Sequence, residues 1–398
     1  MNRAVATFNT GSSSLKFALY EIEDAAPGAC LLRCNIKDLS GDLSIDIAPE
    51  SGVTPDDIKS VIANIEPNPA HLLPALLEHL LGFFDKYEIA AIGHRIVHGG
   101  QLRVQACASS VQILSELERL SALAPDHQPH NLAGVKALQT SHPSHFQSLS
   151  FDTSFHRTIP EVSQLYAIPK ALSDDGLLRF GFHGLSYDSI ATRAPDSLAG
   201  RAHSKIIAAH LGSGASLCAI RDGQSVATTM GLTALSGIPM AKRCGDIDPG
   251  LILYLIGERG LTHEQILDML YRQSGLLGMS GISADTRILL SDARVSAKRA
   301  IDHYVERIAR EIGALSVALE GLEAIVFTGG VGENAPEIRR RICQKLHYLG
   351  VQVDQSANLA HCDIISARSS RVSVAVLKAD EEQIIARDAI TVWNASQE

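Results

Sequence analysis

The stretch AVATFNTGSSSLKF, residues 4–17, places a polar turn of small residues between two apolar segments near the start of the chain. The apolar residues predict two strands, at 5–8 and 17–22, joined by that turn. Small side chains let backbone N–H groups come close to a phosphate, and hydroxyl groups add further donors. The stretch therefore predicts a strand–turn–strand unit, and phosphate binding is one explanation for the composition of its turn.

The same pattern returns half a chain later in IIAAHLGSGA, residues 206–215. Each copy has an apolar strand, one polar residue (Asn9 or His210), a turn of small residues and a second strand. Strand–glycine–strand units are common, so coincidence is the alternative to an internal duplication. In a duplicated chain, a phosphate-binding hairpin in each half would place a nucleotide in the cleft between the halves.

The composition is that of an ordinary globular enzyme. The chain has 398 residues, which predicts two domains, and it is 45% hydrophobic and 20% charged. Its net charge of −9 argues against nucleic acid or an anionic membrane as a partner. No apolar stretch approaches the roughly 18 residues of a membrane span. An anionic ligand would therefore have to be held by local positive groups.

The cysteines and the N-terminal residues indicate a cytoplasmic protein. Seven cysteines are scattered along the chain without a CxxC pair, which favours reduced thiols over a disulfide framework or a structural zinc. The N-terminal residues lack the basic segment followed by an apolar one that marks a signal peptide. His127 and His130 are spaced like metal ligands, but their context, PDHQPHN at 125–131, predicts a loop rather than a metal-binding helix.

Strand-like and amphipathic segments along the rest of the chain predict an α/β fold. Further strands are expected at 90–96, 147–151, 206–211, 217–221 and 324–328, and helices at 71–87, 110–123, 265–273 and 297–319. A third glycine cluster, FTGGVGENAP at 327–336, lies between the last strand and a helix expected at 337–346. A glycine turn before a helix N-terminus suits a nucleotide, although a tight strand–helix connection is the alternative. Neither a P-loop GxxxxGK[ST] nor a GxGxxG that opens a helix near the N-terminus occurs.

Four charged or polar residues stand alone in apolar or glycine-rich contexts. They are Arg95 in GHRIVHGG, Asp152 in LSFDTSFH, His183 in RFGFHG and Arg243 in KRCGDIDPG. Taken singly, each is best explained as a member of an internal ion pair or as a core histidine. Taken together, they are the groups that in-line phosphoryl transfer needs. Cations neutralise the charge that develops on the phosphoryl oxygens, and a carboxylate orients the nucleophile.

Ordered motifs along the chain resemble those of one known family, the acetate kinases, within the superfamily of sugar kinases, heat-shock chaperones and actin. NTGSSSLKF at 9–17 resembles the family signature NAGSSSxK[FY]. Five further motifs follow in family order: GFHGLS at 181–186, MGLT at 230–233, RCGDIDP at 243–249, FTGGVGEN at 327–334 and EEQIIARD at 381–388. The resemblance runs from residue 4 to residue 388 and so covers nearly the whole chain.

The resemblance implies two duplicated actin-like (ribonuclease H-like) domains with a nucleotide cleft between them. Residues 1–150 with 382–398 would form the N-terminal domain, and residues 151–381 the C-terminal domain. The C-terminal domain would be the one on the side of the nucleotide and of the dimer contact. The implied reaction is reversible phosphoryl transfer from ATP to acetate, giving acetyl phosphate and ADP, with Mg²⁺ or Mn²⁺, in a homodimer. Propionate or another short-chain carboxylate as acceptor is one alternative. A non-catalytic nucleotide switch like actin or a chaperone is another, which a carboxylate-binding arginine disfavours.

The resemblance also assigns residues to the metal and to ATP. Asn9 and Glu381 would lie near the metal, mostly through water, which suits the strongly hydrated Mg²⁺ ion. Residues from four motifs would bind ATP: Lys16; His210, Leu211, Gly212, Ser213 and Gly214; Asp285, Thr286 and Arg287; and Gly330, Val331, Gly332, Glu333 and Asn334.

The remaining implied roles concern the carboxylate and the transferred group. Arg95 would bind the carboxylate substrate, and Arg243 and His183 would stabilise the phosphoryl group in transfer. Asp152 matches the family's proton acceptor. A carboxylate substrate has no proton to lose at neutral pH, so orientation of substrate and metal is the more plausible role for Asp152.

Three positions depart from the family pattern. Ser213 replaces the usual Asn of HLGNG, a change that keeps a hydrogen-bonding group and predicts a modest effect. The acyl pocket, apolar in the family, is expected at Val97, Asp126, Phe182 and Ala234, where the family usually has Leu at the second position and Pro at the fourth. An anion at Asp126 would weaken carboxylate binding unless it points to solvent or pairs with a cation. The carboxylate at position 126 has two interpretations. Either the loop turns Asp126 towards solvent, or the acyl specificity is altered towards a longer or hydroxylated short acid.

Overall fold

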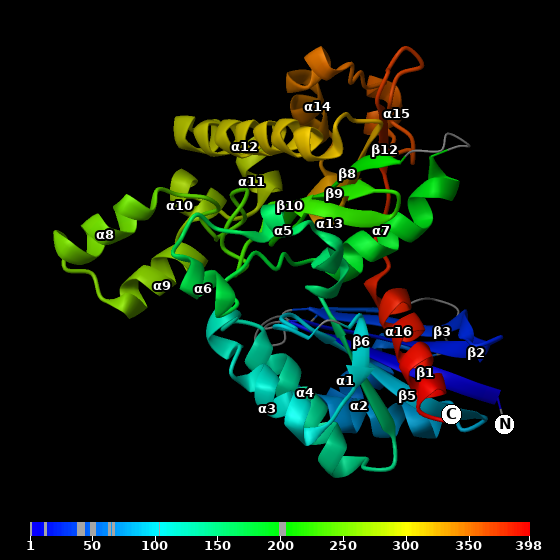
Figure 1. Ribbon diagram of the computed structural model, residues 1–398. Helices are drawn as coiled ribbons and strands as arrows, with labels where there is room; N and C mark the ends of the chain where they lie inside the picture. Colours follow the sequence, from blue (N-terminus) through cyan, green and yellow to red (C-terminus); the bar gives the residue numbers. More distant parts are fainter. Residues whose placement is uncertain are drawn as a thin grey trace. The chain divides into compact units, whose positions relative to one another are not determined.

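The structure of the chain is a computed structural model, drawn in Figure 1. It describes residues 2–11, 14–37, 44–47, 53–62, 65, 68–102, 104–198 and 204–398. The chain divides into two compact units, Met1–Ser154 with Asp380–Glu398, and Phe155–Ala379, called unit 1 and unit 2 below. Each unit has one β-sheet with helices packed on it, so the predicted α/β class is confirmed.

The sheet of unit 1 has seven strands in the order β4-β3-β2-β1-β5-β7-β6. β1 pairs antiparallel with β2 and parallel with β5, and β5 pairs parallel with β7. The carboxyl ends of β1, β5 and β7 therefore lie at one edge of the sheet. The strands are β1 (Asn2–Thr10), β2 (Ser14–Glu23), β3 (Ala26–Lys37), β4 (Ser44–Ile47), β5 (Tyr87–Ile96), β6 (Ala106–Ala108) and β7 (Phe146–Phe151).

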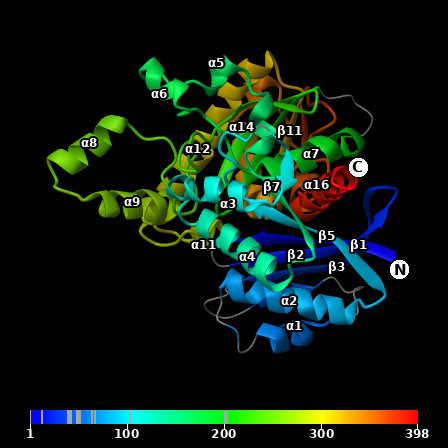
Figure 2. The same cartoon turned by 60° about the horizontal axis from the view of Figure 1, so that its bottom comes forward.

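Helices cover both faces of this sheet because successive side chains of its strands point to opposite faces. On one face, Phe8 and Phe17 pack in a cluster with Leu73 and Leu77 of α2. On the other face, residues of α16 pack against β1, β2 and β5. The helices of unit 1 are α1 (Pro55–Ile62), α2 (Pro69–Phe83), α3 (Val111–Glu118), η1 (Ser121–Leu123), α4 (Gln128–Ser141) and α16 (Glu381–Ala395). Figure 2 shows α1 and α2 together on one side of the sheet.

The sheet of unit 2 has five strands in the order β10-β9-β8-β11-β12. β8 pairs antiparallel with β9 and parallel with β11, and β11 pairs parallel with β12. α7 packs on one face, where Tyr187 and Ile190 join a cluster with Ile206 and Cys218, while α12 also packs against β8, β9 and β10. The strands are β8 (Lys205–Leu211), β9 (Ala215–Arg221), β10 (Gln224–Thr228), β11 (Ala324–Thr328) and β12 (Ser373–Val376).

Most helices of the chain belong to unit 2. They are α5 (Glu161–Gln164), α6 (Lys170–Asp174), α7 (Gly184–Ser197), α8 (Pro249–Gly257), α9 (His263–Arg272), α10 (Gly275–Ser280), α11 (Thr286–Ser291), α12 (Val295–Leu319), α13 (Gly329–Asn334), α14 (Pro336–Lys345), η3 (His347–Leu349) and α15 (Gln355–Leu359), and η2 (Ser154–Thr158) begins at the last residue of unit 1. α8 and α9 extend away from the sheet of unit 2 in both views of the chain (Figure 1, Figure 2).

The two sheets share one topology. β3-β2-β1-β5-β7 in unit 1 and β10-β9-β8-β11-β12 in unit 2 each consist of three antiparallel strands followed by two parallel ones, in the same order along the chain. In each unit the first two strands form the hairpin that the repeated sequence pattern predicts. The strand order therefore supports the internal duplication rather than coincidence.

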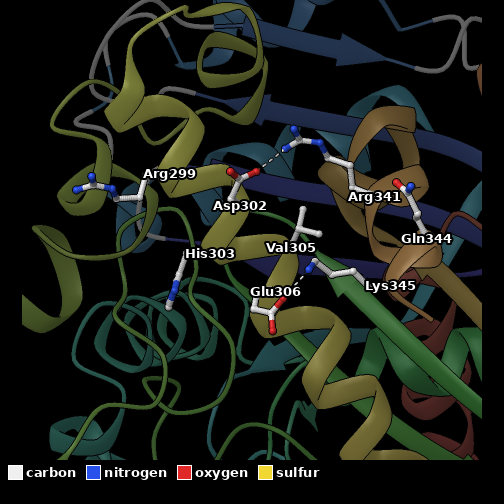
Figure 3. Close-up of a pocket in the computed structure, with 8 residues that line it drawn as sticks. All are labelled: Arg299, Asp302, His303, Val305, Glu306, Arg341, Gln344 and Lys345. Carbon is white, nitrogen blue, oxygen red and sulfur yellow. Dashed lines mark hydrogen bonds and ion pairs between the residues drawn. The ribbon is translucent and has the colours of Figure 1, made fainter. Parts of the chain in front are cut away.

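Two ion pairs join α12 to α14, the helix that follows the FTGGVGEN segment. Arg341 Nη1 donates to Asp302 Oδ1 over 3.2 Å, and Lys345 Nζ lies 2.6 Å from Glu306 Oε2. Figure 3 shows both pairs between the two helices, beside a hollow of about 780 Å³. Each of these carboxylates is matched by a cation of the opposite helix, so this hollow is best explained as part of the packing that holds α14 in place.

Several boundaries differ from the sequence predictions. The helix expected at 71–87 ends at Phe83, because Tyr87 already begins β5. The helix expected at 110–123 is split into α3 and η1. The prediction of a loop at 125–131, which included His130, was wrong from Gln128 onwards. α4 begins at Gln128, with a proline in its first turn. The polar start of α4 hides its helical period, since its buried face includes Gln128 and Asn131.

Two further observations concern the whole described chain. No helix in the ranges given above is long and apolar enough to cross a membrane. All seven cysteines are free thiols in the structure.

Candidate active site

Asn9, Arg95 and Asp152 lie together at the carboxyl edge of the unit 1 sheet, because each ends or follows one of the strands β1, β5 and β7. The Arg95 guanidinium donates from Nε to Asp152 Oδ1 over 3.1 Å and from Nη2 to Asp152 Oδ2 over 2.6 Å. Its Nη1 donates to Asn9 Oδ1 over 2.9 Å. The structure therefore brings these three predicted residues together, and the geometry makes Asp152 the partner that orients Arg95.

Burial changes the pKa values of both members of the Arg95–Asp152 pair. The Asp152 side chain is 2% exposed and the Arg95 side chain 16%. Burial alone raises the pKa of Asp152, and the charge of Arg95 opposes that shift. Burial lowers the pKa of Arg95, but the carboxylates of Asp152 and Glu381 outweigh it, so the pKa lies above its ordinary value. The guanidinium therefore keeps its charge in a site with little water.

The start of α16 adds two carboxylates to this edge. The amide of Asn9 donates to Glu381 Oε2 over 2.8 Å and to Glu382 Oε1 over 3.2 Å. Lys16 of β2, whose Cα is in register with Asn9, has its Nζ 3.8 Å from Glu382 Oε1. We call Asn9, Lys16, Arg95, Asp152, Glu381 and Glu382 the arginine–carboxylate cluster. Of the small residues in the NTGSSSLKF turn, Ser12 and Ser13 lie outside the described residues.

Sequence motifs did not reveal Glu382 or the residues behind it. Arg33 of β3 donates to Asp380 Oδ2 over 2.6 Å and to the Tyr20 hydroxyl over 2.8 Å. Asp380 is the N-cap of α16 and accepts from the Gln383 amide. Arg33 therefore anchors the end of the helix that carries Glu381. Glu382 could have been suspected from the EEQ sequence, but Arg33 lies on a strand that the sequence did not predict.

In unit 2, His183 stands at the N-cap of α7 with a left-handed backbone, φ 60°. Its Nδ1 is 2.8 Å from the hydroxyl of Ser216 on β9, and that hydroxyl is 2.5 Å from the hydroxyl of Tyr187, one turn along α7. The ring of His183 stacks on the ring of His210 with centroids 4.2 Å apart. His210 Nδ1 in turn lies 2.8 Å from the hydroxyl of Ser186. We call His183, Ser186, Tyr187, His210 and Ser216 the histidine–hydroxyl cluster.

The HLGSG turn between β8 and β9 approaches this cluster at Gly214. A Cβ atom placed on Gly214 would lie 3.2 Å from His183 Nε2 and 3.5 Å from Arg243 Nη1. The predicted residues His183 and Arg243 are therefore brought together, on either side of a glycine. Arg243 Nη1 also donates to the carbonyl of Ala234 over 3.3 Å. Ser213, the departure from the family pattern, is exposed at the tip of this turn.

The FTGGVGEN segment lies at the same edge of the unit 2 sheet, because Thr328 of β11 is in parallel register with His210 of β8. It forms the short helix α13, in which the carboxylate of Glu333 accepts from the backbone N–H of Gly329 over 3.0 Å. Gly330 has open space where a Cβ would be. The two glycine segments of unit 2, Leu211–Ala215 in the register of β8 and β9 and Gly329–Asn334, are therefore neighbours, as an ATP-phosphate site requires.

The remaining predicted residues have other settings. Asp285 caps α11 and holds the side chain of Arg287, which is 86% exposed, through a 2.6 Å pair, and the hydrogen bond from Arg287 lowers the pKa of Asp285. Val97 in unit 1 and Phe182 in unit 2 are buried. Asp126 is half-buried in the turn before α4. The structure thus gathers the carboxylate and phosphoryl residues into one cluster in each unit, and leaves Asp285–Arg287 as a separate loop of unit 2.

Comparison with known proteins identifies the family of the chain. The model of the acetokinase family matches residues 4–387. An acetate kinase of Rhodopseudomonas palustris (strain TIE-1) is 43% identical over 410 residues, which cover 99% of this chain and 98% of that protein. A propionate kinase structure from Francisella tularensis has a TM-score of 0.83 at 31% identity and covers 98% and 100% of the two chains. An acetate kinase structure from Porphyromonas gingivalis has a TM-score of 0.79 at 32% identity and covers 98% and 99%. The fold is therefore that of the actin-like kinases, and the chain belongs to the acetokinase family.

Proposed function

We propose that this protein transfers the γ-phosphoryl group of ATP reversibly to acetate, giving acetyl phosphate and ADP. The observation that carries the proposal is the convergence of His183 and Arg243 at Gly214, which has no side chain of its own, beside two glycine segments suited to phosphates. A transferring phosphoryl group spreads negative charge over its equatorial oxygens. A guanidinium and an imidazole N–H on either side of one space are suited to stabilise that charge.

Arg95 is proposed to bind the carboxylate substrate. A guanidinium has five N–H donors, and the bonds to Asp152 and Asn9 engage three of them. The two others, one on each Nη, suit the two oxygens of a small carboxylate. Asp152 holds the guanidinium in orientation and supplies no proton transfer, because acetate is already ionised at neutral pH. Effective positioning of the acceptor is a major part of catalysis for such a reaction.

The proposed metal is Mg²⁺ or Mn²⁺ near Asn9 and Glu381. The donors available at this edge are carboxylate and amide oxygens on a strand end and a helix start, which fits a hard cation that keeps several waters. When bound, the ion would neutralise phosphate charge. Lys16 is proposed for the ATP phosphates as well, together with the HLGSG and GVGEN segments, and Asp285, Thr286 and Arg287 for the adenosine end.

The size of the acid depends on Val97, Asp126, Phe182 and Ala234, which we propose line the acyl group. Ala234 has a smaller side chain than the proline usual in the family, which favours an acid longer than acetate as a secondary substrate. Asp126→Leu should lower the KM for acetate if the carboxylate of Asp126 approaches the acyl group. An unchanged KM with every acid tested would exclude Asp126 from the pocket.

We also propose that the protein is a homodimer formed through unit 2. α8 has the sequence PGLILYLIG with no charged residue and no buried residue. Leu253 is 72% exposed and Tyr254 and Ile256 are each 48% exposed. A second copy of the chain would cover this apolar face. Leu253→Asp should convert a dimer into a monomer in sedimentation, whereas a wild-type protein that sediments as a monomer would contradict the proposal.

The reaction itself is tested by hydroxamate formation with ATP, Mg²⁺, hydroxylamine and a panel of acids from acetate to butyrate. We expect product with acetate, at a higher kcat/KM than with propionate or butyrate. A higher kcat/KM for propionate would assign the protein to the propionate branch of the same chemistry. Absence of product with every acid would contradict the kinase function and favour a nucleotide switch.

A further inference from the structure

The hydrogen bonds that link His183 to Ser216 and Ser216 to Tyr187 determine which nitrogen of the His183 ring carries the proton. We propose that Tyr187 and Ser216 are positioning residues that fix His183 as the neutral tautomer with its proton on Nε2, the nitrogen that faces the space over Gly214. This inference rests on the proposed function for its catalytic consequence. The tautomer itself follows from the geometry of unit 2 alone.

The direction follows from counting donors and acceptors. The Ser216 hydroxyl has one proton and two neighbours, the Tyr187 hydroxyl at 2.5 Å and His183 Nδ1 at 2.8 Å. The hydrogen-bond partner of the Tyr187 hydroxyl is Ser216, and both residues are fully buried, so the phenol proton is satisfied when Tyr187 donates to Ser216. Ser216 then donates to His183 Nδ1, which must be unprotonated and accept.

Burial keeps this chain in one arrangement. Tyr187 and Ser216 are both fully buried, so neither hydroxyl can exchange its partner for water. Burial also raises the pKa of Tyr187 well above its ordinary value, so the phenol keeps the proton that it donates. In the reverse direction His183 Nδ1–H would donate to Ser216 and Ser216 to Tyr187, which would leave the buried phenol proton without the acceptor that Ser216 provides.

A second histidine in the same unit shows the same chemistry in a closed setting. His156 Nδ1 lies 2.9 Å from the buried hydroxyl of Ser225, and its Nε2 lies 3.0 Å from the carbonyl of Phe182. A carbonyl accepts only, so His156 also carries its proton on Nε2 and accepts at Nδ1. In His156 the Nε2 proton is donated to the backbone carbonyl of Phe182. In His183 the corresponding nitrogen faces the space between Gly214 and Arg243.

The tautomer determines what His183 does for a phosphoryl group. With the proton on Nε2, the ring donates a hydrogen bond to a phosphoryl oxygen while Arg243 supplies the positive charge. With the proton on Nδ1, Nε2 would present a lone pair to an anionic oxygen and repel it. A neutral imidazole that is held as a donor by its neighbours is a known way to stabilise developing negative charge.

The tautomer is tested by NMR on full-length protein labelled with ¹⁵N-histidine, at pH 7.5 and without substrates. Long-range ¹H–¹⁵N correlations distinguish Nδ1–H from Nε2–H, and comparison with His183→Gln identifies the His183 signals among the 16 histidines. We expect the wild type to show His183 as Nε2–H. A wild-type Nδ1–H signal or an imidazolium would overturn the proposal.

The variants Tyr187→Phe and Ser216→Ala test the control of the tautomer. Both should raise the Nδ1–H population of His183 and lower kcat about tenfold to hundredfold, with KM for ATP and acetate within about threefold of wild type. Tyr304→Phe, a buried tyrosine of α12, is the matched control and should leave the tautomer and kcat unchanged. Ser225→Ala should alter the signals of His156 and not those of His183. A Tyr187→Phe protein with either the wild-type tautomer or the wild-type kcat would overturn the proposal. A protein that forms no acyl phosphate but shows Nε2–H would reject the proposed function and leave the tautomer assignment intact.

Discussion

The two hairpins β1–β2 and β8–β9 share a strand order but differ in chemistry. Asn9 of the first corresponds to His210 of the second, and their register partners are Lys16 and Ser216. Around Asn9 the structure gathers two cations and three carboxylates within one network. Around His210 it gathers imidazoles, hydroxyls and glycine turns, with Arg243 as the cation. One framework thus supports a network of paired charges in unit 1 and, in unit 2, a site in which hydroxyls, imidazoles and glycine turns surround the cation Arg243.

We therefore expect stability and activity to be coupled in unit 1 and to be largely independent in unit 2. In unit 1 the functional groups are also each other's counter-charges, so removal of one leaves another buried without a partner. In unit 2 His183 bonds a neutral hydroxyl and Arg243 donates to a backbone carbonyl, so a substitution there should change the reaction more than the fold. The contrast gives four predictions, ordered from the largest expected effect.

Arg95→Ala should have the largest effect on both measures. It removes the proposed ligand of acetate and leaves Asp152 buried without its cation, so we expect kcat/KM for acetate to fall about a thousandfold and unfolding free energy to fall by about 3 to 5 kcal/mol. The KM for ATP should change little. Urea unfolding and steady-state kinetics measure the two effects.

Arg243→Ala is the control for that coupling, because Arg243 donates to a backbone carbonyl rather than to a buried carboxylate. It should lower kcat strongly while it lowers the unfolding free energy by less than about 1 kcal/mol. Equal losses of stability in the two variants would contradict the contrast between the units. A defect of Arg95→Ala that is mainly in the KM for ATP would show that Arg95 does not bind the carboxylate.

Acid should destabilise both units, because each holds a buried histidine whose pKa is lowered by burial. Burial lowers the pKa of His94 in unit 1 to about 4 and that of His156 in unit 2 to about 4. The folded pKa lies below the ordinary value, so this stability is present above about pH 6.5 and is lost as the pH falls towards 4, about 3 kcal/mol for each histidine. His94→Gln and His156→Gln should each flatten the slope of unfolding free energy against pH in that window by one proton.

The single tryptophan distinguishes the units in that experiment. Trp393 lies in α16 of unit 1, so its fluorescence follows unit 1, whereas circular dichroism follows both. A slope that is unchanged in either variant would show that the pKa of that histidine is the same in the folded and unfolded states. Acid unfolding seen by circular dichroism but not by fluorescence would restrict the effect to unit 2.

Gly214→Ala should reduce activity without loss of stability. Its backbone needs no left-handed conformation, so alanine is tolerated, but the new Cβ would lie 3.2 Å from His183 Nε2 and fill the space proposed for the phosphoryl group. We expect kcat to fall about a hundredfold and unfolding free energy to change by less than about 1 kcal/mol. Gly82→Ala, on an exposed helix position with nothing within 4 Å, is the control and should keep full activity. Full activity in Gly214→Ala would exclude this space from the reaction.

The sequence predicted the framework well because its signals are local. The apolar periods of the two hairpins, and isolated polar residues such as Arg95 and Asp152 at strand ends, are visible in short windows of sequence. The two interpretations of Arg95, an internal ion pair and a functional group, are compatible, because the pair with Asp152 is what orients the guanidinium. One repeated turn predicts an internal duplication, with coincidence as the alternative, and the repeated strand order supports the duplication.

The supporting residues were not predictable in the same way. Tyr187 and Ser216 are ordinary residues of a helix and a strand, and only the register of β8 with β9 brings Ser216 beside His183. Arg33 lies on β3, whose sequence APGACLLRCNIK lacks a clear alternation of apolar and polar residues. Such contacts join residues far apart in the chain, so no local pattern announces them.

The smallest predicted effect separates the two neighbouring carboxylates of α16. Glu381→Gln should raise the Mg²⁺ concentration for half-maximal activity about tenfold, because it removes a charged oxygen donor from the proposed metal site. Glu382→Gln should change that concentration less than about threefold, because Glu382 is buried and faces Lys16 and Arg33 rather than the rim. It should instead raise the KM for ATP slightly, since Lys16 loses the carboxylate that positions it. Titration of Mg²⁺ at fixed free ATP measures both effects. A larger Mg²⁺ effect in Glu382→Gln would assign the metal to the inner carboxylate, and the charged network of unit 1 would then be a metal site as much as a framework for Arg95.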